Sequence, residues 1–132
     1  MSQAVLDSYY AALRSGDFAT LERLLAPDIR TEYFGPADLL PWSGVHHGFA
    51  GYRRFLSLVR DALELVEMVP EATVAEGEWI VAMGRGLWRA RSSGREIRVG
   101  STNAFRFRDG LIADYRVYTD TAAFAALLSS SQ

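Results

Sequence analysis

Two polar residues, Ser101 and Asn103, interrupt an apolar strand pattern over residues 95–107. Because the side chains of a strand alternate, both share one face with Ile97 and Phe105. An amide such as that of Asn103 costs roughly 1–3 kcal/mol when it is buried without a partner. Asn103 therefore needs either a structural hydrogen bond or a ligand, and a ligand would make Asn103 and Ser101 part of a pocket.

Three residues could move a proton at such a site. His46 and His47 are the two histidines of the chain, and imidazole titrates near neutral pH. We expect no metal site, because the side chains of adjacent residues diverge and no tightly spaced carboxylates surround the two histidines. The alternative to a role in proton transfer is a pair of loop histidines, one exposed and one packed. Glu32 is the other candidate base, since a bulge or one-residue slip would exchange it with Tyr33; otherwise it is a solvated carboxylate.

Composition narrows the chemistry further. The 132 residues contain no cysteine and no lysine, which excludes disulfides, thiolate nucleophiles and Schiff bases on lysine. A formal net charge of −2 gives no basic excess that would attract nucleic acid or a membrane surface. The N-terminal residues lack a secretion-signal pattern and no apolar run reaches spanning length, so we expect a cytoplasmic protein without nucleic-acid or membrane partners.

Two helices are predicted at the start of the chain. Apolar residues at helical spacing run from Ser2 to Gly16, and again from Asp17 until Pro27 stops the pattern. Ser2 and Asp17 can cap these helices, and Gly16 permits the left-handed turn between them. A short strand is then expected over residues 28–34.

The periodicity changes after a third helix. Prolines and glycines mark residues 35–48 as an irregular connection, and residues 49–63 give an amphipathic helix. Pro70 then predicts an edge strand or a bulge in the first strand that follows. The remaining predicted elements are strands over 65–74, 78–91, 95–107 and 111–119 and a short helix after residue 120.

Helices followed by antiparallel strands predict a single α+β domain over residues 1–132. In this order they resemble the nuclear-transport-factor-two-like superfamily, and most closely its SnoaL-like and ketosteroid-isomerase-like branch. The resemblance covers essentially the whole chain and implies a cystatin-like cone, in which three N-terminal helices pack on a strongly curved, mostly antiparallel sheet and enclose a pocket. It rests on four passages: YYAALRSGD (9–17), LLAPD (24–28), GVHHG (44–48) and FRFRDGLI (105–112).

The resemblance also assigns roles to individual residues. In ketosteroid isomerases a tyrosine and a protonated aspartic acid hold the dienolate oxygen, while a separate aspartate carries the proton. The tyrosine corresponds to Tyr9, and the aspartic acid to Asn103, whose amide can donate the same hydrogen bond. The proton carrier corresponds to Tyr33, and the acidic residue of the related hydrolases and cyclases to Val117. Neither Tyr33 nor Val117 carries a carboxyl group, so proton transfer would fall to the histidines or to Glu32.

Several residues have both a pocket interpretation and a structural one. Tyr9 is either an oxyanion donor or a core tyrosine whose hydroxyl finds a partner. Arg85 shares the strand parity of Met83, so it either points inward to bind an anionic or enolic group or pairs at the surface. The predicted pocket walls are Tyr33, Phe34, Trp42, Tyr52, Met83, Arg85, Ser101, Tyr115 and Val117.

Three classes of function remain open. The first is a cofactor-independent enzyme of the isomerase, cyclase or dehydratase type that acts on an apolar cyclic substrate. The second is a binding protein for a small hydrophobic molecule, and the third is a dimeric interaction module with a vestigial cavity. Relatives commonly dimerise through the outer face of the sheet, and Gly84, Gly86 and Trp88 would let another sheet approach, so we expect a homodimer.

Overall fold

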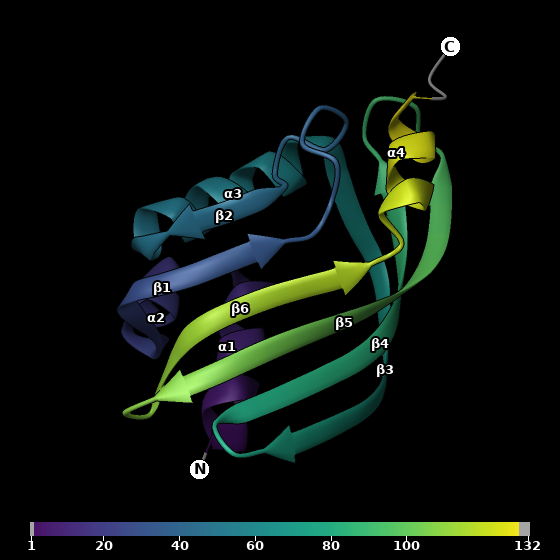
Figure 1. Cartoon of the computed structure of the whole chain (residues 1–132). Coiled ribbons are helices and arrows are strands. Elements are labelled where there is room, and N and C mark those ends of the chain that lie inside the picture. The colour runs from purple at the N-terminus through teal and green to yellow at the C-terminus, as the bar shows by residue number, and fades with distance from the viewer. Residues whose placement is uncertain (1, 130–132) are drawn as a thin grey trace.

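A six-stranded sheet bends around the N-terminal helices (Figure 1). The structure is a computed structural model, and it describes residues 2–129. The elements are α1 (Ser2–Ser15), α2 (Phe18–Leu24), β1 (Leu25–Tyr33), β2 (Gly44–His47), α3 (Gly48–Ala62), β3 (Leu63–Glu76), β4 (Trp79–Ala90), β5 (Glu96–Arg108), β6 (Leu111–Thr119) and α4 (Thr121–Ser129).

The strands lie in the order β2-β1-β6-β5-β4-β3. Neighbours pair antiparallel except β1 and β6, which are parallel. This arrangement confirms the predicted α+β fold with a curved, mostly antiparallel sheet. A fourth helix, α4, covers the far end of the sheet in Figure 1. Within residues 2–129 no helix has the length and hydropathy needed to span a membrane.

The turn between the first two helices forms as predicted. Gly16 has a φ of 71°, a value that side chains with a Cβ rarely adopt. Asp17 then caps α2, since its carboxylate accepts a hydrogen bond from the backbone N–H of Thr20 at 3.1 Å. The following strand begins earlier than predicted, at Leu25. Pro27 lies in the irregular stretch between the paired residues Leu25 and Arg30. Its backbone has no N–H, and none is needed there for pairing with β6.

Two further strand predictions have different outcomes. β3 is an edge strand with a register shift between Pro70 and Ala72, as the proline predicted. By contrast, the irregular connection over residues 35–48 contains the short strand β2, which pairs with β1. Only four residues form β2, which is too short for an alternation of apolar and polar residues to predict a strand.

The inner and outer faces of the sheet follow the alternation of β5. Phe105 and Phe107 are buried on the concave side, whereas Arg98 and Arg108 are exposed on the other. β4 corrects one expectation, because Gly84, Gly86 and Trp88 face inward rather than outward. They pair with Ser101, Val99 and Ile97 on the inner face of β5, so they do not open the outer face to a second sheet. A Cβ added at Gly86 would lie 2.7 Å from Nε1 of Trp88, so the glycine leaves room for the indole on the inner side.

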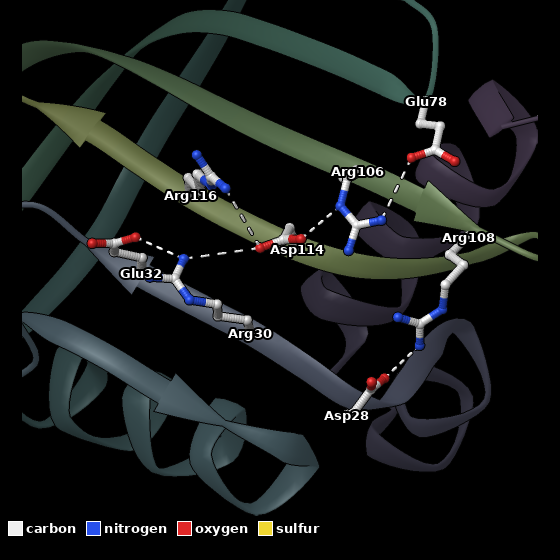
Figure 2. A network of polar contacts seen from close by, with 8 residues as sticks. All are labelled: Asp28, Arg30, Glu32, Glu78, Arg106, Arg108, Asp114 and Arg116. Carbon is white, nitrogen blue, oxygen red and sulfur yellow. Dashed lines mark hydrogen bonds and ion pairs between the residues drawn. The ribbon is translucent and has the colours of Figure 1, made fainter.

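Figure 2 shows a network of charged side chains on the face of the sheet opposite the helices. Asp114 of β6 lies at its centre and is only 6% exposed. Its register partners are Arg30 on β1 and Arg106 on β5. Arg106 donates to its carboxylate at 2.7 Å, and the guanidinium groups of Arg30 and Arg116 lie at 3.9 Å. One buried carboxylate therefore links three neighbouring strands, β1, β6 and β5.

On the concave side, a hydroxyl pair joins α1 to α3. The hydroxyls of Tyr9 and Tyr52 lie 2.7 Å apart, and both side chains are fully buried. The ring of Tyr9 also packs edge-on against Phe105 at 5.5 Å between centroids. These contacts hold α1 on the inner face of β5.

We expect Asp114→Asn to lower the free energy of unfolding by about 1.5–3 kcal/mol, because it removes charge-assisted hydrogen bonding from a buried site. Urea denaturation measures the change. The matched control is Glu78→Gln, which alters an exposed partner of the same Arg106 at 3.5 Å and should cost less than about 0.5 kcal/mol. Equal losses in the two variants would contradict the central role of Asp114.

Burial raises the pKa of Tyr9, Tyr52 and Tyr115 above the usual value for a phenol. The folded chain thus holds these protons more tightly than the unfolded chain, whose tyrosines ionise near pH 10. The free energy of unfolding should therefore be constant up to about pH 10 and fall as the pH rises further. Urea denaturation between pH 7 and pH 11 tests this.

Two variants isolate the hydroxyl pair in the same experiment. Tyr9→Phe should cost about 1 kcal/mol at pH 7 and flatten the alkaline fall, since it removes one buried phenol. Tyr118→Phe, which alters an exposed side chain, should change neither quantity. A wild-type stability that stays level to pH 11 would refute the linkage.

Candidate functional site

A cavity of about 660 Å³ lies between the helices and the concave face of the sheet. Its wall is mainly apolar, which is typical of sites for small organic molecules. Aromatic side chains supply much of it: Tyr10, Tyr33, Trp42, Phe55, Trp88, Tyr115 and Phe124. Tyr115 stacks on Phe105 with 5.1 Å between the ring centroids, so this part of the wall is supported by the core behind it.

The amide of Asn103 on β5 is one of the polar groups in this wall. It interacts with the hydroxyl of Tyr10 on α1. Burial raises the pKa of Tyr10, and the hydrogen bond from Asn103 offsets part of that increase. The phenol therefore keeps its proton at neutral pH, and both side chains can donate a hydrogen bond to a ligand oxygen.

Ser101 also lies on the cavity wall, one inward-facing position before Asn103. Its hydroxyl donates to Oγ1 of Thr119 at 3.1 Å, and the Thr119 hydroxyl donates to the carbonyl of Gly100 at 2.9 Å. Because its proton is already used, Ser101 offers a ligand an acceptor rather than a donor.

The structure places Tyr9 in the core and Tyr10 at the cavity. Tyr9 does not line the cavity, and its hydroxyl pairs with that of Tyr52, so the structural interpretation of Tyr9 fits better. The sequence held a signal for Tyr10. Gln3, Asp7, Tyr10 and Arg14 recur at helical spacing and form a polar stripe beside the buried stripe that contains Tyr9.

None of the three predicted proton carriers lines the cavity. Nε2 of His46 lies 2.7 Å from the carbonyl oxygen of Trp42, and its ring packs against Phe55. His47 is exposed at the start of α3. Glu32 lies on the outer face of β1 and pairs with Arg30 at 2.8 Å. No slip exchanges it with Tyr33, because the neighbouring pairs with β6 fix the register.

The other predicted wall residues divide into two groups. Tyr33, Trp42, Tyr115 and Val117 line the cavity, and burial raises the pKa of Tyr33, so its phenol stays protonated. The structure places the rest away from this wall: Phe34 is exposed and stacks on Tyr118, Tyr52 is buried behind Tyr9, Met83 borders a second cavity, and Arg85 pairs with Glu71 at the surface at 3.0 Å.

The second cavity, of about 440 Å³, adjoins the first. Tyr10, Asn103 and Ser101 line both, so this polar group stands between the two spaces. Asp7 of α1 lines the second cavity and accepts a hydrogen bond from the Gln3 amide at 2.9 Å. Among residues 2–129 no three His, Asp or Glu side chains are grouped closely enough to hold a metal ion.

The chain was also compared with known proteins. It matches the model of the SnoaL-like domain over residues 6–115. An NTF2-like protein from Burkholderia xenovorans LB400 is 27% identical, with 96% of this chain and 95% of that chain covered and a TM-score of 0.85. A protein of unknown function with a cystatin-like fold from Xanthomonas campestris is 22% identical, with coverages of 96% and 97% and a TM-score of 0.80.

A proposed SnoaL-like polyketide cyclase from Jannaschia sp. CCS1 is 17% identical, with 98% of this chain and 92% of that chain covered and a TM-score of 0.81. The last two similarities show the fold alone. A comparison with curated proteins finds no significant match. The family model, in contrast, spans most of the sequence and both sides of the cavity, from α1 to β6. The chain therefore belongs to the SnoaL-like domain family, as the resemblance predicted.

Proposed function

We propose that this protein is an isomerase- or cyclase-type enzyme that holds an apolar cyclic molecule in the larger cavity and stabilises its enolate. Asn103 and Tyr10 donate hydrogen bonds to the ligand oxygen that gains negative charge. An isomerase requires proton transfer between a side chain and carbon, a cyclase adds the formation of a carbon–carbon bond, and neither step needs a cofactor. The family membership supports this class of reaction.

The single observation that carries the proposal is the pairing of Asn103 with Tyr10 on a mainly apolar wall. An amide in such a place needs a partner, and the Tyr10 hydroxyl alone leaves part of its donor capacity unused. Fixed donors in a cavity that excludes water stabilise a developing oxyanion more than water does, because they need no reorganisation.

Asp7 is the proton carrier in this proposal. It precedes Tyr10 by one helical turn and lines the second cavity, not the larger one, so it would reach the ligand where the two cavities meet at Tyr10 and Asn103. The other carboxylate on a cavity wall, that of Glu64, already pairs with Arg89 at 3.0 Å. Asp7 removes a proton from the carbon next to the ligand carbonyl, and the electron pair moves onto the oxygen. The enolate then takes the proton back at another carbon. In a cyclisation, its carbon instead attacks a second carbonyl carbon of the same molecule, and the oxygen of that carbonyl takes the proton from Asp7.

Ligand binding without turnover is the second candidate. It is favoured by the positions of both histidines and Glu32, which lie away from the cavity, and by the exposure of Asp7. An interaction module with a vestigial cavity has less support, since about 660 Å³ is within the usual range of small-molecule sites.

We expect 2-naphthol, a planar phenol that mimics a cyclic enol, to bind in the larger cavity. Tyr10→Phe and Asn103→Ala should each raise the dissociation constant about tenfold, equivalent to about 1.4 kcal/mol. Fluorescence titration measures it, with thermal unfolding as a check of folding. Tyr9→Phe, one residue away on the same helix, is the control and should bind like wild type. If Tyr9→Phe weakens binding and Tyr10→Phe does not, the donor assignment is wrong.

Catalysis has its own test. We expect the wild-type protein to accelerate exchange of the acidic protons of 2-tetralone for deuterium in D2O, followed by proton NMR. Asp7→Asn should slow this exchange about 100-fold or more, since general-base catalysis contributes roughly that much. Asp61→Asn, an exposed carboxylate of α3 that lines neither cavity, should have no effect. Binding without any accelerated exchange would favour the binding protein over the enzyme.

A further inference from the structure

Three arginines from separate segments line one end of the larger cavity. Arg14 lies in the last turn of α1, Arg60 in the last turn of α3, and Arg91 directly after β4. All three side chains are exposed while they border the cavity, so this end is its opening to solvent. We refer to these three residues as the arginine mouth.

Hydrogen bonds fix the segments that carry the arginine mouth. Arg60 donates from Nη2 to the carbonyl of Leu13 at 3.4 Å. Arg91 donates from Nε to the carbonyl of Arg60 at 2.5 Å and from its backbone N–H to the carbonyl of Ala62 at 2.9 Å. The ends of α1, α3 and β4 are thereby tied together. Arg60 and Arg91 each retain unused N–H groups, since a guanidinium has five.

The charge of the arginine mouth is not balanced by carboxylates. In contrast, every arginine on a strand has a carboxylate partner: Arg30, Arg85, Arg89, Arg98, Arg106, Arg108 and Arg116. Among the residues that the structure describes, Arg14, Arg60 and Arg91 form no ion pair. Glu64, the carboxylate on the same wall, is taken up by Arg89. The opening is therefore locally positive in a chain whose net charge is −2.

We infer that the ligand of this cavity carries a carboxylate, which the arginine mouth binds. Planar guanidinium groups match a carboxylate with two parallel hydrogen bonds, and such charge-assisted pairs are stronger than neutral ones. The inference rests on the proposed function, because it takes the cavity as the ligand site. It adds the substrate class: a cyclic or aromatic acid, with its carboxylate at the opening and its keto or enol oxygen at Asn103 and Tyr10.

A matched pair of probes tests this class. 2-Naphthol and 6-hydroxy-2-naphthoate share their ring and hydroxyl, and at pH 7 only the second carries a negative charge. We expect fluorescence titration at low salt to give about tenfold tighter binding of the naphthoate. This advantage should shrink as the salt concentration rises from about 20 mM to about 500 mM, since salt screens exposed charges.

Variants assign the effect to residues. The triple variant Arg14→Gln, Arg60→Gln, Arg91→Gln should lose the preference for naphthoate and keep its affinity for naphthol. Arg14→Gln alone should reduce the preference about threefold. Arg14 has no hydrogen bond or ion pair among the described residues, so its replacement should not unfold the protein. This single variant therefore tests the inference even if the triple variant unfolds. Arg54→Gln, an exposed arginine of α3 that lines neither cavity, is the control and should keep the preference.

The outcomes separate the inference from the proposed function. If naphthol binds through Asn103 and naphthoate binds no more tightly, the carboxylate assignment is wrong and the oxyanion site stands. If naphthoate is preferred equally by wild type and by both arginine variants, another group binds the anion and the assignment is also wrong. If neither probe binds, both the inference and the proposed function fail.

Discussion

The ion pairs of Asp114 set the register on which the rest of the molecule depends. Its partners on both sides, Arg30 and Arg106, are also its neighbours across the sheet. Because side chains alternate, a slip of one residue in β1 would bring Glu32 inward in place of Tyr33 and would separate Arg30 from Asp114. A buried carboxylate without partners is costly, so the slipped sheet is disfavoured. The network thus acts through the specificity of pairing more than through net stability.

The correct register gives the concave face two different regions. One is solid, where Tyr9, Tyr52 and Phe105 fill the space between the helices and β5. The other is the cavity, which begins one residue further along α1, at Tyr10. Tyr115 belongs to both regions, since it stacks on Phe105 and also lines the cavity. The cavity is therefore backed by a packed aromatic core.

Local signals in the sequence were sufficient for most of the fold. Apolar spacing, the cap at Asp17, the turn at Gly16 and the proline of β3 each act within a few residues, and the structure agrees with them. The short strand β2 was missed because it exists through pairing with β1, which is not local. Strand alternation is local, so it placed Asn103 on the inner face correctly. The choice between Tyr9 and Tyr10 is not local, because it depends on how α1 is rotated against the sheet.

The arginine mouth was outside the reach of sequence reasoning, because its members come from three segments that meet only in the folded chain. Local stability explains part of it. The carbonyls at the ends of α1 and α3 carry partial negative charge, and a cation in the last turn is favourable there. Those same carbonyls would repel an anionic ligand. Arg60 and Arg91 donate to them and so reduce that repulsion, while Arg14, which donates to none, adds charge that the helix ends do not need. This excess is the part of the arrangement that stability alone does not explain.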